Sequence, residues 1–279
     1  MIREPLPMRL LLVAGTHGVE PQSSAFLNSL LTQILSIDET DENSENGVVH
    51  SSINTDLNKR SIGILSISQL LGLTAHSVEE TALQINDLEL NIDQLKDFKI
   101  IAIPALNPHG LKNFTRHNHN DVDLNRNMPS QNWQSAKFRI DGEKNPYYPG
   151  DFPASEIETQ LLTKLIEGLD FDLIISFHTN HFIRFPNPPQ VNYDGLGTHK
   201  DFAIKLARDT ELEFTEDIGY PTPGSLGSYS KDKGLDCITI EFDDNITAEE
   251  LNNKYLKAFT ENIISLFKNQ NSELSTKTI

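Results

Sequence analysis

Short apolar runs bounded by polar residues or glycine recur along the chain and predict buried strands. The first is residues 9–15 (RLLLVAG), and similar runs follow at residues 99–106 (KIIAIPAL), 171–177 (FDLIISF) and 236–242 (DCITIEF). Runs of this length with turn signals at their ends are typical of strands that are buried in a sheet. Four segments of the chain are therefore expected to form strands of one core.

Amphipathic segments with helical spacing lie between these runs. Residues 21–37 repeat apolar side chains at intervals of three and four, which predicts a helix with one buried face. Ser155-x-x-Glu158 and Thr247-x-x-Glu250 have the pattern of a capping box and predict the start of two further helices. Strands that alternate with helices predict an α/β domain with a mainly parallel or mixed sheet.

The rest of the chain gives weaker signals about its organisation. We expect one catalytic domain over residues 1–267 and a polar, frayed tail over residues 268–279. Residues 38–97 begin with the acidic stretch 38–46 (DETDENSEN), which predicts a solvated loop, and continue without a clear periodicity.

Charge and composition exclude several classes of function. The 279 residues include 23 Lys and Arg against 40 Asp and Glu, a net charge of −17. This excess of negative charge argues against nucleic-acid binding and against docking on anionic membranes. Cys237 is the only cysteine, which excludes a disulfide framework. No apolar run reaches the ~20 residues of a membrane span, and the N-terminal run is too short for a signal peptide. A cytoplasmic protein is predicted.

Ionisable residues follow the first predicted strand at the place where α/β proteins collect functional groups. His17 and Glu20 lie in the turn between that strand and the first helix. Functional residues of such folds gather at the carboxyl ends of strands. An imidazole and a carboxylate three residues apart can face one cation, and one further histidine would complete the three ligands of a catalytic zinc site. The spacing alone is a weak signal, because the same residues can simply be solvated.

The remaining histidines leave the third ligand open. His178 ends an apolar strand, where a polar residue satisfied by its surroundings is the commoner explanation, and His181 lies close to it in sequence. This stretch alone therefore does not say which of the two would bind a metal. His117 and His119 lie in a polar loop and are expected to face solvent.

A glutamate interrupts the last apolar strand. Glu241 stands between Ile240 and Phe242, where burying a carboxylate is costly unless it is paired or serves a function. Burial would raise its pKa and prepare it for proton transfer. The alternative is a residue of an edge strand that points to solvent.

A polar cluster precedes Met128 and suggests recognition of an anion. Arg126 is suited to bidentate contact with a carboxylate, and Asn125 adds an amide donor. Asp123 could accept the second ring N–H of a metal-bound histidine. A surface loop with an ordinary ion pair is the alternative explanation.

Seven motifs, taken in order, resemble those of the zinc carboxypeptidase superfamily of the carboxypeptidase A type. They are THGVE, NPHG, an arginine before VDLNRN, SEIET, SFH, TPGSLGS and ITIEF. Within the superfamily the chain looks most like bacterial murein-tripeptide amidases, which cleave between γ-D-glutamate and meso-diaminopimelate in the cytoplasm. The resemblance implies a single-domain α/β fold with a central mixed, mostly parallel, twisted sheet of eight strands flanked by helices.

The resemblance also implies the metal ligands and the catalytic groups. His17, Glu20 and His178 match the ligands of one zinc ion per chain. Glu241 matches the general base, and Arg116 matches the arginine that stabilises the oxyanion. An ion held in this way would activate water for attack on an amide bond.

Five further positions match residues that orient the substrate or the metal ligands. Asn125 with Arg126 corresponds to the clamp for a free carboxylate, and Asp123 to the partner of the first histidine ligand. Tyr220 corresponds to the mobile tyrosine that covers the substrate, across a one-residue gap. Leu226 falls near the position that selects the side chain after the scissile bond. An apolar selector there does not demand a charged side chain.

The chain departs from the family in three places. It begins almost on the strand before THGVE. Residues 38–97 are longer than the equivalent connection in the murein amidases and form a family-divergent insertion. Residues 179–184 also differ from those of the amidases.

Three functions therefore stay open. The first is a carboxypeptidase or amidase acting on a small peptide with a free carboxylate, and murein tripeptide is the leading substrate. The second is a zinc-dependent N-acyl amino acid deacylase of the aspartoacylase and succinylglutamate desuccinylase type, which shares GTHG-x-E and a DLNR segment. The third is an inactive binding module. The sequence predicts no oligomeric state.

Overall fold

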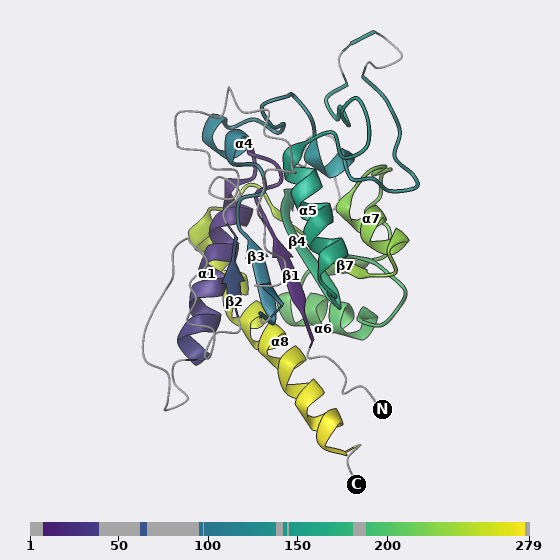
Figure 1. The fold of residues 1–279 in the computed structure, drawn as a ribbon. Coiled ribbons are helices and arrows are strands. Elements are labelled where there is room, and N and C mark those ends of the chain that lie inside the picture. The colour runs from purple at the N-terminus through teal and green to yellow at the C-terminus, as the bar shows by residue number, and fades with distance from the viewer. Residues whose placement is uncertain are drawn as a thin grey trace, which may run out of the picture.

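The chain folds around one twisted sheet with helices on both of its faces (Figure 1). The computed structural model describes residues 8–38, 62–65, 95–96, 98–137, 142–143, 145–180 and 188–276. The described strands, in chain order, are β1 (Leu10–Val13), β2 (Ile62–Ile64), β3 (Ile100–Ile103), β4 (Leu173–Asn180), β5 (Gln190–Asp194), β6 (Glu213–Thr215) and β7 (Asp236–Asp243).

The sheet is mixed and mostly parallel, as predicted. Its strand order is β2-β3-β1-β4-β7-β5-β6, and among these described strands the one antiparallel pair is β5 with β7. The described part of the chain holds seven strands, one fewer than the eight that the family resemblance implied. All four segments that the apolar runs predicted as strands are strands of this sheet, and they include the central β1, β4 and β7.

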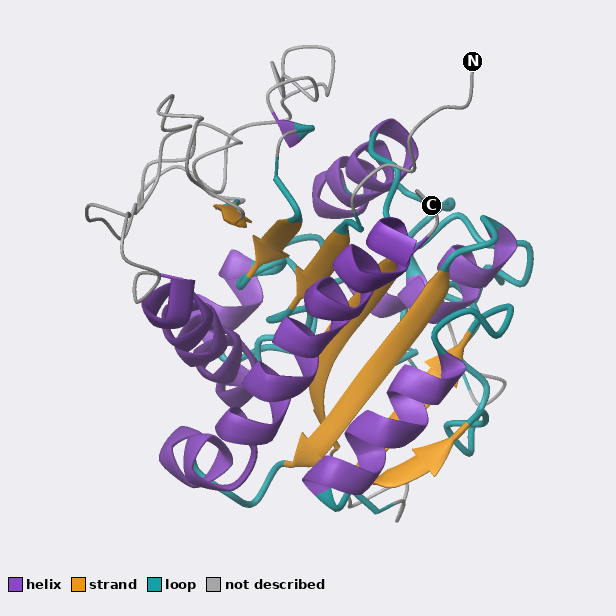
Figure 2. Ribbon diagram, turned by 90° about the horizontal axis from the view of Figure 1, so that it is seen from below, coloured by secondary structure: helices purple, strands orange, loops and turns teal. Residues whose placement is uncertain are grey.

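Helices cover both faces of the sheet, which Figure 2 shows in a view from below. The described helices are α1 (Pro21–Asp38), α4 (Pro108–Asn113), η2 (Leu124–Arg126), α5 (Ile157–Gly168), α6 (Lys200–Thr210), α7 (Leu226–Asp232) and α8 (Ala248–Thr276). Helices α1, α6 and α8 share one hydrophobic core with the sheet, whereas α5 and α7 belong to a second core on the opposite face.

The residues of β1 explain why the strand sequences are continuously apolar. Leu10 and Leu12 belong to the core beneath α1 and α8, while Leu11 and Val13 belong to the core beneath α5. Successive side chains of a strand point to opposite faces, so a strand that is covered on both sides needs apolar residues at every position. The run LLLV meets this requirement, and all four side chains are fully buried.

One of the two predicted capping boxes is confirmed. Thr247 and Glu250 exchange hydrogen bonds ahead of α8, with the Glu250 N–H donating to Thr247 Oγ1 at 3.2 Å and the Thr247 N–H donating to Glu250 Oε2 at 2.7 Å. The prediction of a capping box at Ser155 and Glu158 is wrong. Helix α5 begins at Ile157 without a side-chain cap, because Glu158 turns inward to Asn118.

The C-terminal segment is more helical than expected. Helix α8 continues to Thr276, well into the segment that we expected to be a frayed tail. Residues 268–276 (KNQNSELST) contain neither glycine nor proline, so no residue in them interrupts the helix.

Most of segment 38–97, including nearly all of the acidic stretch 38–46, lies outside the described residues. Its described part contributes β2, which pairs in parallel with β3 at the edge of the sheet. The boundaries of the catalytic domain and of the divergent insertion stay predictions. No helix in the described residues is long and apolar enough to cross a membrane.

Candidate active site

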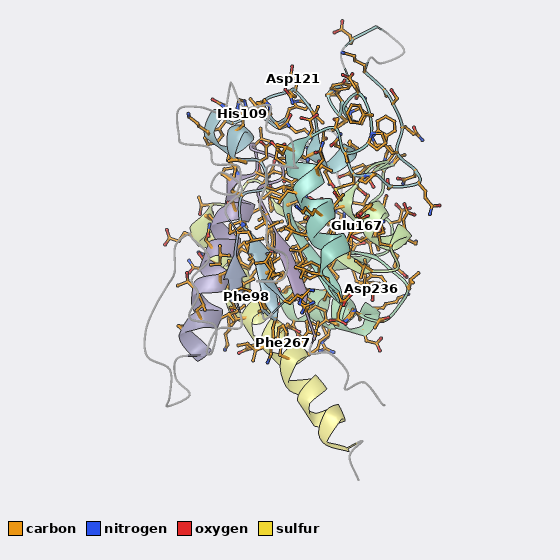
Figure 3. All side chains as sticks on the ribbon, viewed as in Figure 1. Phe98, His109, Asp121, Glu167, Asp236 and Phe267 are labelled. Atoms are coloured by element: carbon orange, nitrogen blue, oxygen red, sulfur yellow. The ribbon has the colours of Figure 1, made fainter. Side chains whose placement is uncertain are left out.

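The candidate residues gather at the edge of the sheet where β1, β4 and β7 end. Phe98 and Asp236 mark the amino ends of β3 and β7, and His109 and Asp121 lie beyond the opposite, carboxyl edge (Figure 3). The loops and helix starts at this carboxyl edge carry His17, Glu20 and the segment around Arg116. This is where an α/β sheet places its functional groups.

A tight turn positions His17 and Glu20 between β1 and α1. Gly18 packs directly on the backbone of α4, and a Cβ atom at this position would lie 1.8 Å from the carbonyl carbon of Gly110. Only glycine permits so close an approach. The His17 carbonyl also accepts a hydrogen bond from the Glu20 N–H at 3.1 Å, which closes the turn. The turn thus directs both side chains toward the end of β4.

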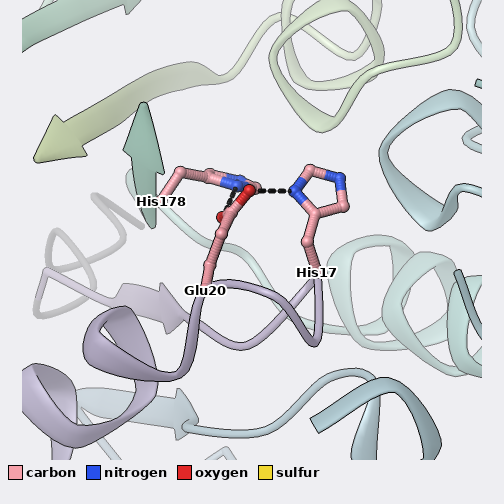
Figure 4. Close-up of side chains that lie close together, drawn as sticks. All are labelled: His17, Glu20 and His178. Carbon is pink, nitrogen blue, oxygen red and sulfur yellow. Dashed lines mark hydrogen bonds and ion pairs between the residues drawn. The ribbon is translucent and has the colours of Figure 1, made fainter. Parts of the chain in front are cut away.

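His17, Glu20 and His178 converge on one point (Figure 4). One ligand atom from each lies within 4.8 Å of the other two, and all three residues are buried. Glu20 Oε1 is 2.7 Å from His17 Nδ1, and Glu20 Oε2 is 3.0 Å from His178 Nδ1. These are the three side chains that the sequence resemblance implied as zinc ligands.

The outer ring nitrogens of both histidines contact other groups. His17 Nε2 lies 3.1 Å from Asp123 Oδ1, and His178 Nε2 lies 3.1 Å from Ser176 Oγ. Such contacts orient a metal-binding imidazole and leave the inner nitrogen for the ion. Two imidazole nitrogens and one carboxylate are also a donor set typical of catalytic zinc. The residues present therefore fit a zinc ion held by the Nδ1 atoms and Glu20.

Charge in this cluster favours deprotonated carboxylates. Burial opposes the charged form of Glu20, but His17 and His178 outweigh it and hold its pKa well below the ordinary value. Arg116 and His17 likewise hold the pKa of Asp123 well below its ordinary value despite burial. For His17 itself, the carboxylates of Glu20 and Asp123 overcome burial and Arg116, and its pKa is raised. Glu20 and Asp123 are thus deprotonated and can accept hydrogen bonds.

Glu241 lies in the middle of the sheet beside these groups. Strand β7 runs between β4 and β5, and Glu241 is in register with His178. Its neighbours Ile240 and Phe242 point into the core on the other face. Glu241 is 7% exposed, so the alternative of a solvent-facing residue on an edge strand is wrong. Burial, together with the charge of Glu20, raises the pKa of Glu241 to about 7.

Two arginines flank the cluster and share an aromatic partner. Arg116 Nε donates to Asp123 Oδ2 at 2.8 Å, and Arg116 Nη1 lies 3.8 Å from Glu20 Oε1. The Tyr147 ring centroid lies 5.1 Å from Arg116 Cζ and 5.5 Å from Arg126 Cζ. Sequence reasoning missed Tyr147, because a tyrosine in a Pro-rich loop carries no recognisable pattern. The electron-rich face of the ring attracts both guanidinium groups.

The other predicted substrate contacts line a pocket next to His178. Asn125, Tyr220 and Leu226 are among its lining residues. The Leu226 N–H donates to Asn125 Oδ1 at 3.0 Å, which orients the amide and leaves its Nδ2 donors for a ligand. Burial and the nearby Glu241 raise the pKa of Tyr220, which keeps its hydroxyl protonated. Burial and Arg116 lower the pKa of Arg126, although Asp123 opposes them.

The other histidines lie apart from this cluster where the structure describes them. His119 is exposed, as expected, and His117 is half-buried with its Nε2 2.8 Å from the Pro146 carbonyl oxygen. His181, the competing candidate for the third ligand, lies outside the described residues.

Comparison with known proteins agrees with this geometry. Residues 80–188 match the family described as zinc carboxypeptidase. Murein peptide amidase A of Escherichia coli strain K12 is 36% identical over 163 residues, and the enzyme of the same name from Vibrio campbellii is 32% identical over 164 residues. These alignments cover 56% and 57% of this chain. The chain spans 63% and 62% of the length of these two relatives.

A solved structure gives the same picture of the fold. The murein-tripeptide amidase from Escherichia coli O157 is 27% identical, and the two structures superpose with a TM-score of 0.55. The superposition covers 92% of this chain and 81% of the amidase. Its coverage of this chain is wider than that of the sequence alignments.

The mixed sheet carries at its carboxyl edge a buried His-Glu-His group that could hold a metal ion. The predicted resemblance to the zinc carboxypeptidases is confirmed, and the similar proteins include murein peptide amidases. The matched family is described as zinc carboxypeptidase, and His17, Glu20 and His178 are the described residues that could hold a metal ion. The matched stretch 80–188 contains Arg116 and His178, whereas Glu20 and Glu241 lie outside it.

Proposed function

We propose that the protein is a zinc-dependent metallocarboxypeptidase or amidase that hydrolyses an amide bond next to a free carboxylate. The observation that carries this proposal is the convergence of His17, Glu20 and His178 within 4.8 Å beside the buried Glu241. We propose a murein-derived peptide as the substrate, cleaved between γ-D-glutamate and meso-diaminopimelate. The names of the relatives, which are murein peptide amidases, support this choice.

His17, Glu20 and His178 would hold one zinc ion per chain. When bound, zinc in such a site supplies a water whose pKa is lowered to about 7 and polarises the carbonyl of the amide. Asp123 keeps the His17 ring in place through the contact of 3.1 Å to Nε2. Ser176 does the same for His178.

Glu241 is the group that moves the proton. Its pKa of about 7 lies at the pH where a carboxyl can both accept a proton and give it up. It takes the proton of the attacking water and delivers it to the nitrogen of the departing amine. Its place in register with His178 keeps its carboxylate beside the metal ligands.

The arginines act on the negative charges of the reaction. Arg116 lies beside Glu20 and presents positive charge where the oxyanion develops, a role in which one donor is worth ~3–4 kcal/mol. Arg126 with Asn125 would bind the free carboxylate of the residue that leaves as the amine, which positions the amide for attack. Tyr220 would cover the bound peptide from the pocket wall.

Two of the three alternatives from the sequence are thereby less favoured. The relatives are amidases rather than N-acyl amino acid deacylases, and an inactive module would have no reason to retain Glu241 in a buried position. We also propose a cytoplasmic location, where the amidases that the chain resembles act.

A matched pair of substrates tests the proposal. γ-D-Glutamyl-meso-diaminopimelate is assayed as the free acid and with the carboxylate next to the scissile bond amidated, together with an N-acetyl amino acid. The zinc-loaded wild type should cleave the free acid at least tenfold better in kcat/KM than the amide, because an unpaired Arg126 loses a charge-assisted hydrogen bond of ~1.5–3 kcal/mol. Arg126→Ala should remove this preference. Cleavage of the acetylated amino acid alone would identify a deacylase instead.

A further inference from the structure

Gln190 lies beside the candidate general base, Glu241. It is the first residue of β5, and the antiparallel register of β5 with β7 sets it directly opposite Glu241. Residues that are directly opposite in an antiparallel pair share a face, with Cβ atoms about 4.5–5.5 Å apart. The next pair, Val191 and Ile240, belongs to the hydrophobic core on the other face of the sheet. Gln190 and Glu241 are therefore both on the face that carries the candidate metal centre.

The strand order places Gln190 on the far side of Glu241 from the metal ligands. Strand β7 lies between β4 and β5, so His178, Glu241 and Gln190 form one row across three strands. Neighbouring strands are about 4.8 Å apart, so Gln190 is two strand spacings from His178 and one from Glu241. Glu241 thus has the metal ligands on one side and the amide of Gln190 on the other.

The amide of Gln190 is buried without an acceptor for its hydrogens. Gln190 is 4% exposed, and its Nε2 atom donates to no group. An amide donor that loses its contact with water and gains no acceptor is unfavourable in free energy. Such groups are uncommon in folded proteins, and each one calls for an explanation. A carboxylate in register on the neighbouring strand is an acceptor that this donor can reach.

We infer that Gln190 is the positioning residue of the general base, whose Nε2–H donates to the oxygen of Glu241 that faces away from the metal ligands. A carboxylate can accept hydrogen bonds on both oxygens. The other oxygen is then held toward the metal ligands, where it takes the proton of the attacking water. Asp123 orients the ring of His17 in a comparable way. The inference rests on the proposed function, because only a Glu241 that moves a proton needs such a partner.

Asn192 offers the competing acceptor on this face. It follows Gln190 by two residues on β5, is 3% exposed, and its Oδ1 atom accepts no hydrogen bond. A contact between these two amides would satisfy both and stabilise the strand. Charge favours Glu241, because hydrogen bonds to ionised acceptors are stronger than those between neutral groups. A contact with Asn192 leaves kcat unchanged, whereas a contact with Glu241 acts on kcat.

Gln190→Met tests the assignment, because methionine has nearly the length and shape of glutamine but no amide donor. With γ-D-glutamyl-meso-diaminopimelate, the zinc-loaded variant should lose about tenfold or more in kcat and keep its KM, since one hydrogen bond to a charged group is removed. Gln33→Met, at a half-buried position of α1, should keep the wild-type kcat.

A double-mutant cycle shows whether Gln190 acts through Glu241. In the Glu241→Met background, Gln190→Met should change the residual kcat little, because the group that Gln190 orients is gone. A wild-type kcat in Gln190→Met would overturn the assignment in favour of the contact with Asn192. An undiminished loss in the Glu241→Met background would overturn it as well, since Gln190 would then act on the substrate directly.

A measurement without turnover separates this inference from the proposed function. The side-chain amide resonances of Gln190 are assigned in the zinc-loaded, isotope-labelled wild type through their connection to the backbone. In Glu241→Met, the Nε2 proton resonances should move upfield, because their charged acceptor is lost. If they move and no peptide is cleaved, the contact with Glu241 stands and the proposed amidase function fails alone. Unmoved resonances would overturn the contact, even if Gln190→Met does not fold.

Discussion

Glu158 is a buried acid outside the reaction, and its replacement should stabilise the protein at neutral and higher pH. The side chain is 4% exposed and accepts long hydrogen bonds, of 3.3 and 3.4 Å, from Asn118 Nδ2. The same Asn118 group donates to Glu156 at 2.7 Å. Burial, with the charge of Glu156 as a further cause, raises the pKa of Glu158 to about 7. Gln at this position could accept the same hydrogen bonds without a charge.

The raised pKa sets both the sign and the size of the effect. The unfolded chain releases the proton near pH 4.5, whereas the folded chain keeps it until about pH 7. The contribution of Glu158 to stability is therefore complete below pH 4.5 and is lost as the pH rises through 7. The difference of 2.5 pKa units between about 7 and 4.5 corresponds to about 3 kcal/mol.

Denaturant unfolding of Glu158→Gln and wild type at several pH values measures this effect. The difference in unfolding free energy should grow in favour of the variant by up to ~3 kcal/mol between about pH 4.5 and pH 8. Comparison with wild type at each pH cancels the contributions of the other acids, because both proteins contain them. Glu213→Gln, at an exposed position of β6, should give no such trend. A difference that stays constant with pH would refute the reasoning.

Two further predictions concern the reaction centre. His178→Ala should remove most of the bound zinc, measured by metal analysis of the purified protein, while His119→Ala at an exposed position should retain it; equal loss from both would show that His178 is not a ligand. Glu241→Gln should keep the zinc and the fold but lower kcat by ~10²–10⁴-fold, since it removes the proton acceptor; loss of zinc from this variant would instead make Glu241 a ligand.

The metal cluster could be predicted from the sequence because each of its residues stands at a recognisable place. His17 and Glu20 follow an apolar strand, and His178 lies near the end of another, so the rule for carboxyl ends of parallel strands brings them together. Sequence spacing could not distinguish His178 from His181. The resemblance to the zinc carboxypeptidases supplied that choice, and strand parity agrees with it, because Phe177 fills the core on the opposite face.

Local sequence signals failed where a tertiary contact competed with them. Ser155 and Glu158 have the capping-box pattern, yet Ser155 Oγ donates to Glu156 at 2.6 Å and Glu158 is drawn to Asn118. The Asn118 loop lies over the start of α5, a proximity between residues about 40 positions apart that no local pattern contains. At Thr247 and Glu250 both residues are exposed, nothing competes, and the capping box forms.

The pocket below the metal centre shows a different limit. Residues 190–194 (QVNYD) alternate polar and apolar residues, which is the pattern of a strand with two unlike faces. The pattern predicts that Gln190, Asn192 and Asp194 share a face, but not which face it is. That depends on the antiparallel pairing with β7, which sets Asn192 opposite Thr239 on the side of Glu241. A shift of one residue would turn Asp194 into the core. The register of β5 therefore decides which of its side chains line the pocket beside His178.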